Sequence, residues 1–128
     1  HFDLFQLTGA AIMRKPERVH RIFERLKSEG MRPEQMLAVL YWEIKNLMNA
    51  WLDINNGLSV KQAMQKANIW PSKQKIIGSY LANQPKEAVD QLVLQACKVD
   101  KVIKGVDIGS PWEEIGLLLF MFSATKSA

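Results

Sequence analysis

Residues 33–55, PEQMLAVLYWEIKNLMNAWLDIN, decide how the rest of this chain folds. Apolar residues recur in this stretch at intervals of three and four, which keeps them on one side of an α-helix because 3.6 residues make one turn. These residues are Met36, Leu37, Leu40, Ile44, Leu47, Met48, Trp51 and Ile54. The spacing predicts a long helix at the centre of a bundle, with four side chains buried most deeply: Leu40, Ile44, Leu47 and Trp51.

Both ends of this predicted helix carry signals. Pro33 suits the first helical turn, where its missing N–H needs no partner. After the helix, Asn55, Asn56 and Gly57 are expected to supply the left-handed conformations that end it. Polar residues interrupt the stretch too often for a membrane span: Glu43, Lys45, Asn46, Asn49 and Asp53.

Six more segments show helical spacing, and proline, serine or glycine marks their ends. No segment alternates apolar and polar residues for long enough to predict a strand. The expected helices cover Leu4 to the residues before Pro16, Pro16 to about Glu29, Ser59 to Ala67, Pro71 to Asn83, Pro85 to Lys104, and Trp112 to about Thr125. In the helix that begins at Pro85, the spacing places these residues inside: Ala88, Leu92, Val93, Ala96, Val99 and Ile103. The 128 residues are therefore predicted to form a single all-α domain, one compact bundle of about seven helices around the long central helix.

The chain has a formal charge of +4 and a pI near 9.3, and its basic residues are unevenly spread. Between Ile54 and Lys86 there are five lysines and no acidic residue. Such a segment either faces a polyanion or is an ordinary solvated lysine face, and the modest charge favours the solvated face. The candidate residues for facing DNA are Lys61, Lys66, Lys73, Lys75 and Lys104. A second basic group crowds the start and outer face of the second helix, partly matched by two acids: Arg14, Lys15, Arg18, Arg21 and Arg25 against Glu17 and Glu24.

Catalytic and metal-binding signatures are absent from the sequence. The two histidines are His1 and His20, and His20 among arginines is expected to be solvated. Cys97 has apolar neighbours and no histidine partner, so we expect a buried structural thiol. Glu113 and Glu114 point about 100° apart on a helix, and the helix dipole explains acids in a first turn. We therefore expect no enzymatic activity, no cofactor and no metal in this chain.

Two of the four tryptophans invite a functional interpretation. Trp42 lies off the central apolar stripe, where it is either a lid over a neighbouring helix or part of an interface. Trp70 precedes Lys73 and Lys75 at a helix start, which suits an anion-binding or DNA-facing corner. The simpler interpretation, which we expect to hold, is that the Trp70 ring packs a loop against the bundle.

The last predicted helix is apolar on every side, since no charge follows Glu114 until Lys126. One face suffices to pack it onto the central helix: Trp112, Ile115, Leu119 and Phe122. A helix that is apolar all round must be buried on all sides or meet a partner. The candidate subunit interface is therefore Leu117, Phe120, Met121 and Trp42. In the alternative, the amino-terminal helix covers the residual face.

Five motifs, in this order, cover nearly the whole chain: Leu7-Thr8-Gly9-Ala10-Ala11-Ile12-Met13, Leu26-x-x-x-Gly30-x-x-Pro33, Trp70 with Lys73 and Lys75, Lys101-x-x-Lys104-Gly105, and Trp112-x-Glu114-Ile115-x-Leu117-Leu118-Leu119. In their combination and spacing, the chain resembles the C-terminal helical (collar) domain of the delta subunit of the bacterial DNA polymerase III clamp loader. No single motif is specific to that family.

The resemblance implies a part in loading the sliding clamp onto primed DNA. In that family, two AAA+-type modules precede the helical domain, and collar domains of five subunits associate in a ring. Residues 1–128 would then be one collar domain from a longer protein, which fits a chain that opens on His1 without an initiator methionine. The implied partners are clamp-loader subunits of the gamma/tau and delta-prime types, whereas the sliding clamp would be bound only by the missing N-terminal module. The loop from Gly105 to Ser110 would approach the template strand, although it has no aromatic or basic side chain.

Two functions remain open. The first is an assembly module that acts through protein–protein contacts, and the second is a helical nucleic-acid-binding domain that uses the lysines of residues 54–86. A steep salt dependence of DNA affinity would favour the second, because each phosphate contact releases a counterion. Cys97 is the single cysteine, which excludes an internal disulfide and, with no signal peptide or membrane segment, predicts a cytoplasmic protein.

Overall fold

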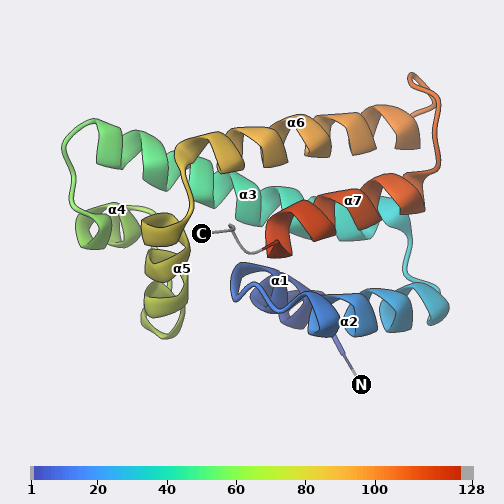
Figure 1. Cartoon of the computed structure of the whole chain (residues 1–128), viewed down its shortest axis with the longest axis horizontal. Helices are drawn as coiled ribbons and strands as arrows, with labels where there is room; N and C mark the ends of the chain where they lie inside the picture. Colours follow the sequence, from blue (N-terminus) through green and yellow to red (C-terminus); the bar gives the residue numbers. More distant parts are fainter. Residues whose placement is uncertain (1, 125–128) are drawn as a thin grey trace.

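The computed structural model describes residues 2–124, and over that range the chain forms seven α-helices and no strand (Figure 1). They are α1 (Leu4–Ile12), α2 (Pro16–Ser28), α3 (Pro33–Asn55), α4 (Val60–Lys66), α5 (Pro71–Asn83), α6 (Lys86–Ile103) and α7 (Pro111–Ser123). The predicted all-α bundle of about seven helices around a long central helix is confirmed.

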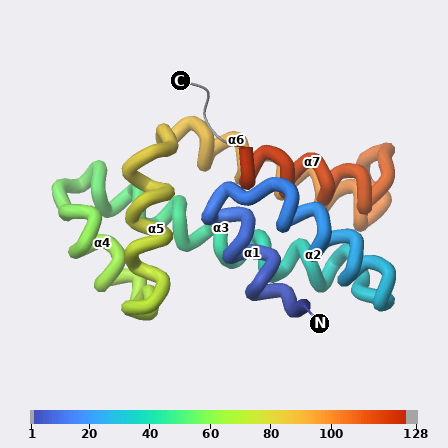
Figure 2. The backbone as a smooth tube through the Cα atoms, turned by 60° about the horizontal axis from the view of Figure 1, so that its bottom comes forward, coloured from blue at the N-terminus to red at the C-terminus, as the bar shows by residue number. Residues whose placement is uncertain are grey.

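Helix α3 is the axis of the bundle. Helices α6 and α7 run along it, α1 and α2 form a hairpin on the far side of α7 from α6, and α4 and α5 close one end (Figures 1 and 2). The chain reverses between α2 and α3 at Gly30, whose φ of +93° needs a residue without a side chain. The short α4 starts with a capping box, in which the Ser59 hydroxyl accepts from the backbone N–H of Gln62 and the Gln62 side chain accepts from the backbone N–H of Ser59.

The boundaries of α3 coincide with those predicted, but the way it ends differs. Only Gly57 adopts a left-handed conformation, with φ of +102°, whereas Asn56 has φ of −90° and Asn55 is still helical. The backbone N–H of Leu58 then donates to the carbonyl of Asp53, which closes the turn. One left-handed residue is enough for this helix stop, so the role predicted for the two asparagines was wrong.

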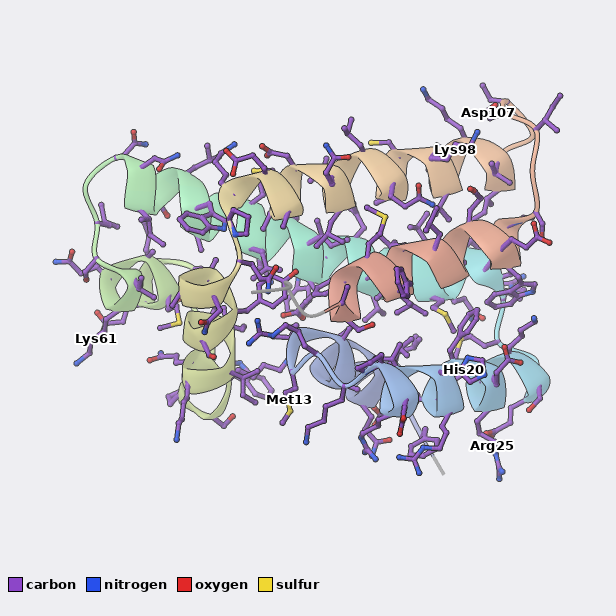
Figure 3. The ribbon with its side chains drawn as sticks, viewed as in Figure 1. Met13, His20, Arg25, Lys61, Lys98 and Asp107 are labelled. Carbon is purple, nitrogen blue, oxygen red and sulfur yellow. The ribbon has the colours of Figure 1, made fainter. Side chains whose placement is uncertain are left out.

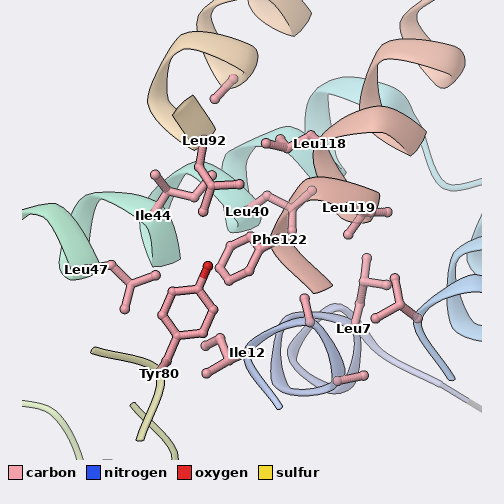
Figure 4. Close-up of a cluster of buried hydrophobic side chains, with 14 of the residues drawn as sticks. Leu7, Ile12, Leu40, Ile44, Leu47, Tyr80, Leu92, Leu118, Leu119 and Phe122 are labelled. Atoms are coloured by element: carbon pink, nitrogen blue, oxygen red, sulfur yellow. The ribbon is translucent and has the colours of Figure 1, made fainter. Parts of the chain in front are cut away.

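The core forms where α3 meets the other helices (Figure 4). Leu40, Ile44 and Leu47 are buried as predicted. Around them lie side chains from four other helices: Leu7 and Ile12 of α1, Tyr80 of α5, Leu92 of α6, and Leu118, Leu119 and Phe122 of α7. Deep burial of Trp51 was predicted wrongly, because the end of α3 runs past α7 towards α4 and its ring is only partly covered there.

Some expectations for α6 were also wrong. Val89 and Val102 are buried where Ala88 and Ile103 were predicted to be, and Val93 is only partly buried. Cys97 is exposed instead of buried. Cys97 follows the buried Ala96 directly, and neighbouring positions on a helix point about 100° apart. Apolar neighbours in the sequence therefore said nothing about the environment of the thiol. The predicted end of α7 near Thr125 lies outside the described residues, and α7 is assigned to Ser123.

A buried charge links three helices. The side chain of Glu43 on α3 is almost fully buried, and its Oε2 lies 3.8 Å from Nζ of Lys73 on α5. The same ammonium group lies 6.0 Å from the ring centre of Phe5 on α1. Burial raises the pKa of the Glu43 carboxyl above its ordinary value, and the nearby Lys73 only partly opposes this shift.

We predict that replacing a central leucine destabilises the domain far more than replacing an outer one. Leu47→Ala should cost about 2–5 kcal/mol of unfolding free energy, because the side chain is fully enclosed and leaves a cavity. Leu52→Ala, in the same helix but 47% exposed, is the matched control and should cost less than about 1 kcal/mol. Urea unfolding measures both. A cost below about 1 kcal/mol for Leu47→Ala would contradict the central position of α3.

A second prediction concerns the pH dependence of stability. Because the folded state raises the pKa of Glu43, it holds this proton more tightly than the unfolded chain does. The stabilising contribution is full below the ordinary pKa of 4.5 and is lost as pH rises through the folded-state pKa. Glu43→Gln should therefore gain stability relative to the parent as pH rises from about 4 to 7. The exposed Glu24→Gln is the control, and a Glu43→Gln difference that does not vary with pH would refute the assignment.

Candidate interaction surfaces

Helix α7 buries one side and leaves an apolar outer side. Of the face predicted to pack on α3, Ile115, Leu119 and Phe122 are buried, and Leu118 joins them. Trp112, also predicted for that face, is only partly buried, and its ring meets Phe23 of α2. On the outer side, Leu117 is 45% exposed and Phe120 is 66% exposed, while Met121 is partly buried against the core. Helix α1 contacts α7 but does not cover Phe120. Two of the three α7 residues named from the sequence are thus open to solvent.

An open groove of about 580 Å³ separates α7 from α2. Its lining includes Val19, Phe23, Trp112 and Leu119, and Phe120 stands at its edge. The rings of Phe23 and Trp112 meet edge to face with centroids 5.8 Å apart. Nζ of Lys27 lies 5.8 Å and 5.7 Å from the centres of these two rings, so the ammonium group caps the aromatic pair.

Sequence reasoning missed this groove, although its residues carried a signal. Lys27 follows Phe23 by four residues, about one helical turn, which places the two side chains on the same side of α2. The pairing with Trp112 depends on how α2 and α7 pack, which periodicity within one helix does not reveal. His20 is exposed, as predicted, and Figure 3 shows it on the side of α2 that faces α7, where it lines the groove.

Trp42 lies on a different face from the α7 residues. Its side chain is about half exposed, so the ring is not a closed lid over a neighbouring helix. Trp42 follows the buried Leu40 by two positions, which turns it about 200° round α3. Since Leu40 faces α7 in the core, Trp42 points away from α7. The four residues of the predicted interface therefore do not form one continuous patch.

Most lysines of the segment without acids have acidic partners from elsewhere. Lys66 pairs with Asp53 of α3 at 2.9 Å, Lys73 with Glu43 of α3, and Lys86 with Asp90 of α6 at 3.1 Å. Lys61 and Lys75 are exposed. The absence of acids within residues 54–86 thus overstated the charge of this surface, because the neighbouring helices supply them.

The remaining DNA-facing candidates are scattered. Lys104 pairs with Asp100 at 2.9 Å near the end of α6 that lies away from α4 and α5 (Figure 1). Trp70 is 73% exposed, so the expectation that it plugs a loop was wrong. The physical reason is that α5 begins at Pro71, and the exposed side chains of Pro71 and Ser72 follow Trp70 at an open helix start.

The loop between α6 and α7 is tied back to α6. Nζ of Lys98 donates to Oδ2 of Asp107 at 2.8 Å (Figure 3). This hydrogen bond lowers the pKa of Asp107 and raises the pKa of Lys98, so both groups stay charged across the neutral range. Val106 and Ile108 are exposed on either side of it. The loop therefore presents two aliphatic side chains, one on each side of an ion pair with α6.

No catalytic or metal-binding constellation emerges among residues 2–124. No group of three or more His, Cys, Asp or Glu side chains in this range is placed to hold a metal ion. Glu113 is exposed and Glu114 is partly buried in the first turn of α7, where acids suit the helix dipole. Burial raises the pKa of Tyr80 to about 12, and its ring packs against Phe122 in the core. His1, the other histidine considered, lies outside the described residues.

None of the helices in the described part of the chain has the length and hydropathy that crossing a membrane requires.

Comparison with known proteins assigns the chain to a family. No curated protein matches the sequence at a significant level. The family model described as "DNA polymerase III delta subunit, C-terminal domain" matches residues 2–123, which is nearly the whole chain. The all-helical bundle agrees with the resemblance stated from the sequence motifs, and the chain belongs to the family of C-terminal domains of the DNA polymerase III delta subunit.

Proposed function

We propose that this domain holds the delta subunit in the clamp loader by binding a neighbouring subunit through the outer side of α7. The observation that carries the proposal is the exposure of Phe120 and Leu117 on a helix that is already packed on its other side. Burying a large apolar side chain contributes about 1.5–3 kcal/mol, so leaving these two in water without a partner is unfavourable. Large aromatic side chains are also the usual anchors of protein interfaces.

The groove beside α7 extends this proposed surface. Its apolar floor and the exposed ring of Phe120 form one continuous area across α2 and α7. Charged side chains line it on both sides, with Glu24 and Lys27 on α2 and Glu113 on α7. Such an apolar centre with a charged rim is typical of protein–protein interfaces. Trp42 would serve a second contact, because a ring of subunits gives each domain two neighbours.

The proposed partners are the collar-type domains of gamma/tau and delta-prime subunits, within a clamp loader that acts on primed DNA in the cytoplasm. The sliding clamp would be bound by modules that precede this domain in a longer chain. The domain itself would be non-catalytic. The second candidate function, DNA binding by the lysines of residues 54–86, is less well supported because Lys66, Lys73 and Lys86 are paired with acids.

A charge placed on α7 tests the proposed interface. Phe120→Asp should leave the domain folded, because the side chain is 66% exposed, and should abolish or strongly weaken assembly of the loader. Assembly is measured by co-purification of the full delta subunit with gamma/tau-type and delta-prime-type subunits. The matched control is Leu94→Asp on α6, which is 62% exposed and should assemble normally.

Two results would count against this interface. If Phe120→Asp unfolds the domain, as judged by circular dichroism, the helix is part of the core and the interface lies elsewhere. If Phe120→Asp assembles as well as Leu94→Asp does, α7 is not the contact surface. Trp42→Asp, measured in the same way, tests the proposed second contact separately.

The non-catalytic role also has a direct test. The domain contains no phosphate-binding loop, so the purified chain should show no ATP hydrolysis above background and no binding to the sliding clamp. A phosphate-release assay and a pull-down with the clamp measure these. ATPase activity that a single substitution within residues 1–128 abolishes would refute the assignment.

A further inference from the structure

The outer flank of α2 carries a row of arginines that the assembly surface does not use. Arg18, Arg21 and Arg25 follow one another at intervals of three and four residues. This spacing keeps them within an arc of about 60° on the helix, over a length of about 10 Å. Arg14 and Lys15 continue the positive charge just before α2 begins. We call Arg18, Arg21 and Arg25 the arginine row.

The arginine row points away from the groove beside α7. Figure 3 shows Arg25 projecting outward from α2, while His20 lies on the side that faces α7. Glu24, an acid of the same helix, lines the groove together with His20. Lys27 also lines the groove and Glu29 pairs with Arg25, so charge alone does not distinguish the two flanks. None of the three arginines lines the groove, however, so a ligand on the arginine row would not compete with a partner on α7.

The guanidinium groups of the row remain available. Within residues 2–124, the side chain of Arg21 is exposed and joins no ion pair or hydrogen bond. Arg18 lies over the ring of Phe2, 5.6 Å from its centre, and such stacking leaves the edge of the guanidinium free. Nε of Arg25 donates to Glu29 at 3.1 Å, which uses one of the five N–H groups of a side chain that is 61% exposed.

The chemistry of this row favours phosphate over a protein surface. Protein interfaces are anchored by exposed apolar or aromatic side chains, and α2 has no large exposed apolar residue. Arginine binds phosphate oxygens through paired N–H groups, which suits a charged backbone. Among the other basic segments, residues 54–86 have three of their five lysines already paired with acids. The arginine row is thus the less neutralised basic surface.

From these observations we infer that the arginine row binds the phosphate backbone of duplex DNA without sequence preference. We assign the contacts of the row to phosphate oxygens, and phosphate contacts position DNA without specifying its sequence. The inference stands apart from the proposed assembly surface. It also differs from the lysine segment considered from the sequence, because it assigns DNA contact to another helix.

The test measures binding of the purified chain to a fluorescein-labelled DNA duplex by anisotropy across a range of salt concentrations. The triple variant Arg18→Gln, Arg21→Gln, Arg25→Gln should bind at least about tenfold more weakly at low salt. The slope of log affinity against log salt should fall by about 2–3, because each phosphate contact contributes about 0.9. The charge-matched control Lys61→Gln, Lys66→Gln, Lys75→Gln should change the slope by less than about 1.

Arg21→Gln alone covers the case in which the triple variant does not fold. Because Arg21 is exposed and unpaired within the described range, its replacement should leave thermal unfolding unchanged and lower the slope by about 1. The inference is overturned if the arginine and lysine variants lose equal affinity, since net charge would then explain binding. It is also overturned if the parent shows no salt-dependent DNA binding. A third contrary result is that polyglutamate or phosphatidylserine vesicles compete as effectively as unlabelled duplex.

Discussion

The apolar side of α3, from Met36 to Ala50, is covered from several directions at once by α1, α5, α6 and α7. Each large side chain enclosed there contributes about 1.5–3 kcal/mol, in a domain whose net stability is expected to be about 5–15 kcal/mol. The helices that contact α3 are therefore placed by the need to reach this one surface, whereas α2 packs on α1 and α7.

The same geometry explains why α7 has an open side. Helix α7 meets α1, α2, α3 and α6, and its buried residues lie on the side that these helices cover: Ile115, Leu118, Leu119 and Phe122. Phe120 and Leu117 must then face outward whatever their hydrophobicity. In an isolated domain these partly exposed side chains contribute less to stability than the enclosed ones do. Within a complex they would form the centre of a contact, which is how sequence, packing and proposed function are connected.

Sequence periodicity predicted features that depend on a single helix: the boundaries of α3 and most of the buried face of α7. It failed where the environment comes from another element. Glu43 looked like a polar interruption but sits on the buried side of α3, one turn from both Leu40 and Leu47, with Lys73 of α5 as its partner. The lysines of residues 54–86 looked unopposed because Asp53, Glu43 and Asp90 lie outside that segment. The groove between α2 and α7 likewise exists only once two distant segments pack together.

The central claim is that the outer side of α7 becomes covered when the delta subunit joins its neighbours. Hydroxyl-radical footprinting of the intact subunit, free and in the assembled loader, measures this side chain by side chain. The account predicts that Phe120 and Leu117 are oxidised in the free subunit and protected in the complex, while Leu94, which is comparably exposed on α6, is oxidised equally in both. Equal oxidation of Phe120 in the free and assembled states would contradict the account.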